Sequence, residues 1–137
     1  LDRNYFGNSI VTAKILDELK LLETTGVNIN LQTKNLTIYF KLALVTGDNL
    51  GVHSLLGFSE SFNHPKFCRF CRMNKSQINE IYDESQVEIR TEKNYQEDIT
   101  KNDSKTTGIV GPCVFLGASD FHPTKNISVD VMHDILE

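Results

Sequence analysis

The chain has no tryptophan, only three prolines and only three cysteines among its 137 residues. Two of the cysteines form a C-x-x-C pair, so the set indicates a metal site or a reducing compartment rather than the disulfide framework of a small secreted domain. No apolar stretch approaches the roughly 18–20 residues that a membrane-spanning helix needs. The sequence therefore predicts no membrane partner, and no signal peptide or other targeting segment is recognisable.

An excess of basic residues is also absent, because 18 acidic side chains outnumber 14 basic ones and leave a formal net charge of −4. A self-contained DNA-binding module usually carries a basic field, so this class of protein is disfavoured. A catalytic domain whose carboxylates hold metal ions remains compatible with the charge. The sequence starts at Leu1 and stops at Glu137, inside a predicted helix, so we expect it to be a piece of a longer protein.

Hydrophobic periodicity predicts one helix and two strands in the first third of the chain. Apolar residues recur at helical spacing over 9–24, and Gly26 is the expected stop. Residues 27–31 alternate apolar and polar side chains as a half-buried strand does. Residues 35–46 are rich in β-branched and aromatic side chains, which predicts a longer strand that ends just before Asp48. A second helical pattern follows.

The remainder of the chain is less regular. Residues 75–84 predict a short helix. Residues 83–107 are polar and densely charged, which predicts a solvated connection with at most one loose helix. Ser128 is placed as the N-cap of a last helix that starts near Val129. The apolar residues expected on the core face of that helix are Val131, Met132, Ile135 and Leu136.

Asp48 lies between two glycines in the segment GDNLG, directly after the predicted apolar strand. A carboxylate at the C-terminal end of a buried strand is where α/β folds place catalytic groups, and such a carboxylate commonly binds Mg²⁺. A structural role explains the residue equally well. In that interpretation Asp48 caps the following helix or forms an Asx turn with Asn49.

Cys68 and Cys71 have the spacing that lets two thiolates bind one Zn²⁺ across a tight turn. A zinc site needs four ligands, and no second ligand pair with suitable spacing is present. The remaining candidates in the chain are His53, His64, Cys113, His122 and His133. The pair is therefore half of a site that the fold or further sequence must complete. A redox dithiol and two unrelated reduced cysteines remain as alternatives.

Asp130 and His133 lie three residues apart in SVDVMHDILE, so they share one face of the predicted last helix. A carboxylate one turn from an imidazole fixes the tautomer of the ring and raises its basicity. A solvated acidic helix face that includes one histidine explains the same pair without any catalytic role.

The order of these motifs is more specific than any one of them. The strand-ending Asp is followed by a C-x-x-C pair 20 positions later (68 − 48) and by a D-x-x-H histidine 85 positions later (133 − 48). This order resembles that of the RNase H-like DDE transposases of cut-and-paste DNA transposons, and most closely the CACTA-type (CACTA/Mirage/Chapaev-like) group. The segments that carry the resemblance are GDNLGVHSLLGF, FCRFCRMNKSQI, IRTEKNY and NISVDVMHDILE, within residues 36–137.

The resemblance implies an α/β fold, namely part of an RNase H-like catalytic core with a zinc-knuckle-bearing insertion. Asp48 then corresponds to the second acid of the DDE triad and binds Mg²⁺ or Mn²⁺. Cys68 and Cys71 correspond to the first half of a zinc site whose histidine pair lies downstream. Asp130 and His133 correspond to a motif at the edge of the active site, near the scissile phosphate. The first Asp and the final Glu of the triad are expected outside this sequence.

The implied bounds are residues 1–60 for part of the core, 61–82 for the C-x-x-C segment, 83–108 for a polar, charged linker, and 109–137 for the start of the insertion region with the D-x-x-H helix. The full-length parent would act in the nucleus on the DNA of transposon ends, as a homo-oligomer, and the piece alone would be inactive. Two alternatives stay open. One is a domesticated, non-catalytic derivative that binds DNA or protein, and the other is an unrelated zinc-binding interaction module.

Overall fold

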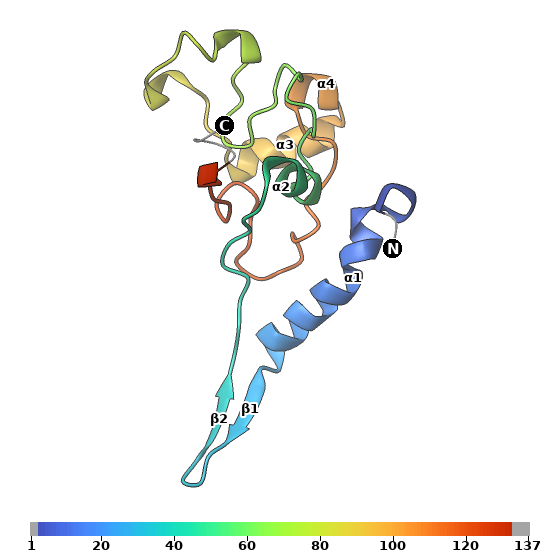
Figure 1. Ribbon diagram of the computed structural model, residues 1–137, viewed down its shortest axis with the longest axis vertical. Coiled ribbons are helices and arrows are strands. Elements are labelled where there is room, and N and C mark those ends of the chain that lie inside the picture. The colour runs from blue at the N-terminus through green and yellow to red at the C-terminus, as the bar shows by residue number, and fades with distance from the viewer. Residues whose placement is uncertain (1–2, 133–137) are drawn as a thin grey trace.

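The computed structural model describes residues 3–132, and Figure 1 shows its elements in chain order. These are α1 (Arg3–Thr24), β1 (Val27–Asn30), β2 (Asn35–Ile38), α2 (Asn49–Leu56), α3 (Glu92–Lys101) and α4 (Ser104–Thr107), together with single 3₁₀ turns at Lys75–Gln77 and Glu84–Gln86. None of the helices in this part of the chain is long and apolar enough to cross a bilayer.

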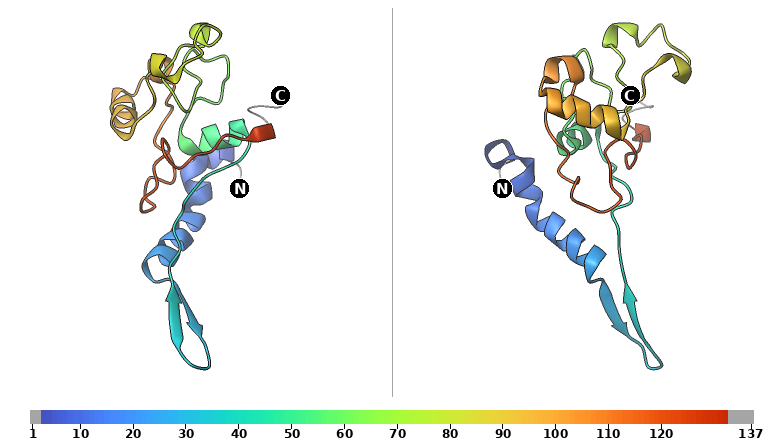
Figure 2. Two further views of the ribbon diagram at one scale, coloured as in Figure 1. Left: turned by 90° about the vertical axis from the view of Figure 1, so that its left-hand side faces the viewer. Right: turned by 180° about the vertical axis from the view of Figure 1, so that it is seen from behind.

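The β1–β2 hairpin follows α1 and extends away from the rest of the molecule (Figures 1 and 2). Helix α1 itself contacts the body, because the Asn8 side chain donates to the Ser54 carbonyl and Leu16 and Leu19 pack against the core. The strands pair antiparallel, with Val27 opposite Ile38. Gly7 has non-helical backbone angles, so the continuous helix starts after it, close to the predicted start at residue 9. Gly26 ends the helix at φ +69°, where an added Cβ would lie 2.6 Å from the Ile38 carbonyl oxygen. The predicted helix over 9–24 and its glycine stop are confirmed.

The second predicted strand is shorter than expected. Pairing in β2 stops at Ile38, whereas the sequence predicts a strand to residue 46. From there the chain runs to the body of the molecule without a ladder partner, until Val45 forms a single parallel bridge with Ile127. A strand requires a neighbour for its backbone groups, and within residues 3–132 the only sheet is the two-stranded hairpin. The RNase H-like sheet therefore remains a prediction.

The hydrophobic core lies between α2, α3 and the segment that follows α4. Its buried members are Val52, Leu56, Phe58, Tyr95, Ile109, Cys113, Phe115 and Phe121. Tyr95 ties these parts together, because its hydroxyl donates to the Leu56 carbonyl at 3.2 Å and accepts from the Cys113 N–H at 3.0 Å. The core thus joins residues that the sequence assigns to three different segments.

The prediction of a solvated connection over 83–107 is wrong in part. Most side chains of this segment are exposed, as predicted, but its second half forms two helices, α3 and α4, and Arg90, Tyr95 and Asp98 are buried. Arg90 pairs with Asp98 inside the protein, so two charged residues of this polar segment are not exposed to water. The helix predicted over 75–84 is reduced to one 3₁₀ turn at Lys75–Gln77.

The last predicted helix is described only at its beginning. Residues 128–130 are not helical, and helical geometry starts at Val131. The cap is therefore not Ser128: the Met132 N–H donates to the Asp130 carboxylate at 3.0 Å. Val131 is 58% exposed rather than turned into the core. The prediction for His133, like those for Ile135 and Leu136, lies outside the described residues.

Candidate metal and catalytic site

Asp48 is the N-cap of α2. Its carboxylate accepts a hydrogen bond of 2.7 Å from the Gly51 N–H, and its side chain is otherwise exposed. This is the structural role that the sequence left open for Asp48, and it satisfies one of the orphan donors at the start of the helix. A cap uses one carboxylate oxygen as an acceptor, so the exposed group retains lone pairs for a cation.

A second segment lies alongside the one that leads to Asp48. Val45 forms a parallel bridge with Ile127, and its N–H donates to the Asn126 carbonyl at 2.9 Å. The Asn126 amide in turn donates to the Ala43 carbonyl at 2.9 Å. Asp48 and Asp130 are each the third residue after the paired position (48 − 45 and 130 − 127). Two of the predicted catalytic acids thus follow, at the same distance along the chain, two residues that are paired with each other.

Arg69, which lies between the two cysteines of C-R-F-C, joins the C-x-x-C turn to both of these segments. The Arg69 side chain is nearly fully buried, and its guanidinium donates to the Asn49 side-chain oxygen at 2.5 Å and to the Ser128 carbonyl at 3.2 Å. Asn49 follows Asp48, and Ser128 lies two residues before Asp130. The three motifs that the sequence singled out therefore meet around one buried guanidinium.

The C-x-x-C turn has the hydrogen-bonding pattern of a metal-binding knuckle. The N–H groups of Phe70 and Cys71 both point at the Cys68 sulfur, at 3.4 Å each. Donors aimed at a sulfur favour its thiolate form, which is the form that binds a metal. This geometry fits half of a zinc site, with Cys68 and Cys71 as the ligands.

The two thiols differ strongly in acidity. A hydrogen bond from the Cys71 thiol, assisted by the backbone N–H groups of Cys71 and Phe70 and by the Arg90 guanidinium, lowers the pKa of Cys68 to about 6 against the opposing effect of burial. The pKa of Cys71 is raised, because its proton is shared with Cys68 and because it is buried. At neutral pH the metal-free turn thus holds one proton between two sulfurs.

No third ligand joins the pair within residues 3–132, where no group of three or more potential metal-binding side chains is found. Cys113 is buried in the core, and burial raises its pKa to about 11. The Nδ1 atom of His64 accepts from the Lys66 N–H at 3.0 Å, and that of His122 accepts from the Thr124 N–H at 3.2 Å. Each of these hydrogen bonds uses one ring nitrogen and leaves Nε2 as a potential ligand, but neither histidine joins Cys68 and Cys71 in a ligand group within the described residues.

A hollow of about 250 Å³ lies next to the Cys68 side chain. Its lining consists of Asn49, His53, Phe62, Phe67, Cys68, Arg69 and Phe70. His53 is 1% exposed, and its Nδ1 lies 2.7 Å from the Ser59 carbonyl oxygen, so this nitrogen carries the proton. The hollow therefore connects the C-x-x-C turn with the first turns of α2, the helix that Asp48 caps.

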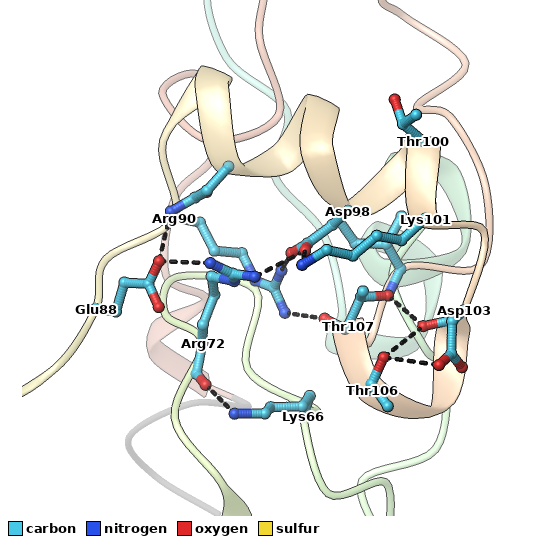
Figure 3. Close-up of polar contacts among 12 residues, drawn as sticks. Lys66, Arg72, Glu88, Arg90, Asp98, Thr100, Lys101, Asp103, Thr106 and Thr107 are labelled. Carbon is cyan, nitrogen blue, oxygen red and sulfur yellow. Dashed lines mark hydrogen bonds and ion pairs between the residues drawn. The ribbon is translucent and has the colours of Figure 1, made fainter.

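A charge cluster centred on the buried Asp98 and Arg90 side chains (Figure 3) lies next to the C-x-x-C turn, because the Arg90 Nε donates to the Cys68 carbonyl. Asp98, with a fully buried side chain, accepts from Arg72 at 2.8 Å and from Arg90 at 3.4 Å, and Lys101 lies 3.7 Å away. Arg72 also pairs with Glu88 at 2.5 Å. Sequence reasoning missed this cluster, because only the segment IRTEKNY was noted and no role was found for its arginine.

The chain was compared with protein-family models, with curated proteins and with solved structures. No protein-family model, no curated protein and no solved structure matches it. The assignment of this site therefore depends on its own residues and geometry and on the motif order of the sequence.

Proposed function

We propose that the chain is part of a cut-and-paste DNA transposase-like protein of the RNase H-like DDE type. In this proposal the full-length parent cleaves and transfers DNA strands in the nucleus, on transposon ends, with Mg²⁺ or Mn²⁺ at Asp48 and Zn²⁺ at Cys68 and Cys71. A homo-oligomeric parent is part of the same proposal.

One observation supports this proposal more than any other: Arg69 links the Asp48 segment, the C-x-x-C turn and the Asp130 segment. The three motifs are separated by up to 82 positions (130 − 48), and a site built from all three requires them to lie close together, as these two hydrogen bonds hold them. Carboxylates that project from adjacent segments are the ligands that Mg²⁺ uses in phosphoryl-transfer sites. Two such ions activate water and stabilise the leaving 3′-oxygen.

The zinc half of the proposal has separate support from the N–H···S bonds at Cys68. A zinc-loaded turn would hold the excursion between Asp48 and Asp130 close to the site. His133, the proposed group at the scissile phosphate, belongs to the same proposal and lies outside the described residues.

The test is DNA cleavage by the full-length parent with an Asp48→Asn substitution. Asparagine keeps the helix cap but removes the charge. We expect cleavage to fall to background with the fold intact. Asp103→Asn is the matched control, because Asp103 caps α4 in the same way, accepting from the Lys105 N–H at 3.1 Å. Equal activity of the Asp48→Asn variant would overturn the catalytic role. The 137-residue chain alone is expected not to nick plasmid DNA.

A zinc-binding interaction module is the second candidate, and the N-cap role of Asp48 favours it, because that role needs no catalysis. A non-catalytic transposase derivative gives the same expectation for cleavage. The two differ in DNA binding by the full-length parent: the derivative retains it, whereas an unrelated module does not.

A further inference from the structure

The segment IRTEKNY runs beside the C-x-x-C turn and is bonded to it along the backbone. Cys71 forms an antiparallel bridge with Ile89, the Arg90 N–H donates to the Phe70 carbonyl at 2.9 Å, and the Arg72 N–H donates to the Glu88 carbonyl at 2.8 Å. One side of the turn is thus paired as a short two-stranded ladder, although 17 residues separate Cys71 from Ile89 in the sequence (89 − 71 − 1).

The Arg90 side chain reaches under the same turn. Its Nε donates to the carbonyl of Cys68 at 3.0 Å, one Nη donates to the Thr107 carbonyl at 2.8 Å, and the other pairs with Asp98 at 3.4 Å. The side chain is completely buried and lies over the Phe58 ring, 5.3 Å from its centroid. Each nitrogen of the guanidinium therefore has a fixed acceptor on a different part of the fold.

We propose that Arg90 is the positioning residue of the C-x-x-C turn, holding the first cysteine through its carbonyl so that both thiols are presented to one divalent cation. The proposal deepens the zinc half of the proposed function and rests on it.

The chemistry of the side chain explains why an arginine stands here. A planar guanidinium can bind three acceptors in fixed directions at once, whereas a lysine ammonium is a single point charge on a flexible stem. Because the Arg90 guanidinium fixes the Cys68 carbonyl, the N–H groups of Phe70 and Cys71 remain directed at the Cys68 sulfur. Without that anchor the turn samples other conformations, and a metal must order it on binding. Loss of such supporting contacts typically weakens metal binding by about 10–100-fold.

The neighbouring residues of IRTEKNY build the support for Arg90. Thr91 caps α3, and the Asn94 side chain closes the capping box and donates to the Ile89 carbonyl at 3.0 Å. Tyr95 anchors the helix in the core, one turn before Asp98. The segment thus fixes the start of α3, which carries the carboxylate that neutralises Arg90.

The experiment is a Co²⁺ titration of the full-length parent, followed by the thiolate-to-cobalt charge-transfer band, for the wild type, Arg90→Lys and Lys101→Ala. Lys101 is the matched control, because it also faces Asp98 but does not touch the turn. We expect Arg90→Lys to weaken Co²⁺ binding by about 10–100-fold and Lys101→Ala to leave it unchanged. Equal affinity of the wild type and Arg90→Lys would overturn the proposal.

Amide hydrogen exchange of the metal-free protein separates this inference from the zinc site itself. Arg90→Lys should accelerate exchange at Phe70 and Cys71 by about tenfold, the scale of one lost buried hydrogen bond, with Tyr95 still protected. If the wild-type protein shows no thiolate-to-cobalt band, the zinc site is refuted, and with it the role of Arg90 in presenting the thiols to a metal. Accelerated amide exchange in Arg90→Lys would still establish that Arg90 anchors the turn. If the Arg90→Lys variant does not fold, amide exchange of the wild-type protein provides the test. The backbone amides of Phe70 and Cys71 should then exchange no faster than the backbone amide of Arg90. Faster exchange at Phe70 and Cys71 would overturn the anchoring role of Arg90.

Discussion

Val45 and Ile127 form a parallel bridge although 82 positions separate them in the sequence (127 − 45). Two hydrogen bonds from the neighbouring residues support the bridge, from the Val45 N–H to the Asn126 carbonyl and from the Asn126 side-chain amide to the Ala43 carbonyl. Its consequence is that the segments leading to Asp48 and to Asp130 start side by side. Motifs that are far apart in the sequence are thus brought close together in the fold.

Replacing Arg69 with lysine should loosen this arrangement. Lysine cannot bind the Asn49 and Ser128 acceptors together, so we expect the free energy of unfolding to fall by about 1–3 kcal/mol and the Val45 amide to exchange faster. Denaturant unfolding and hydrogen exchange measure the two effects. Lys75→Ala is the control, because Lys75 binds only the exposed Phe62–Asn63 loop. Unchanged exchange at Val45 would refute the role of Arg69.

Replacing Tyr95 with phenylalanine tests the core. The ring would stay in place, but the Leu56 carbonyl and the Cys113 N–H would lose their buried partner. We expect a loss of about 1–3 kcal/mol in the free energy of unfolding, measured by denaturant titration. Tyr82→Phe serves as the control, since Tyr82 is 91% exposed and its loss should have almost no effect. Equal stability of both variants would contradict the account of the core.

The Cys68 thiol should titrate far below an ordinary cysteine. Its folded-state pKa of about 6 is depressed from an ordinary 9.0. The resulting stabilisation is therefore complete above pH 9, declines as the pH falls from there, and is lost once the pH has passed through 6. Alkylation rates of the metal-free chain should show a midpoint near 6 that Cys68→Ser removes. In Cys71→Ser, whose hydroxyl replaces the thiol donor, the midpoint should move. A single midpoint near 9 in the wild type would contradict the geometry of the turn.

His133 should matter for chemistry but not for zinc. In the full-length parent, His133→Ala is expected to reduce DNA cleavage about a hundredfold, the scale of one positioned proton-transfer group, with the zinc content unchanged. Cleavage assays and metal analysis on the same preparations measure both quantities. His64→Ala is the control, because the His64 ring accepts from the Lys66 N–H and the proposal gives it no role in cleavage. A parent that loses zinc but keeps its cleavage rate would reverse the assigned roles.

Local signals predicted the beginning of the chain well. The helix over 9–24 and the stop at Gly26 follow from side-chain periodicity and from one residue that tolerates a positive φ, and both are present. The strand over 35–46 was predicted to be longer than it is. The β propensity of a segment indicates that it can pair with another strand, but it does not show that a partner strand is present. Pairing stops at Ile38 and resumes only at Val45.

Long-range pairing of charges was beyond the sequence analysis. Residues 83–107 were predicted to be solvated because they are polar, yet Arg90 is buried against Asp98, and Arg72, from outside this segment, pairs with the same carboxylate. Nothing in a local window shows that one charge will meet another 26 positions away. The candidate site was predicted in part, since Asp48, Cys68 and Asp130 were named, but Arg69, which joins their segments, was passed over as a spacer between two cysteines.

The most direct test of the central claim is a titration of the 137-residue chain with substoichiometric Mn²⁺, followed by paramagnetic broadening of the backbone amide signals. If the Asp130 segment lies beside a cation bound at Asp48, signals around both residues should broaden together at the same Mn²⁺ concentration. Asp48→Asn should remove the broadening from both segments, whereas Asp103→Asn should leave it intact. Broadening around Asp48 alone, or broadening of both segments that persists in Asp48→Asn, would contradict this arrangement.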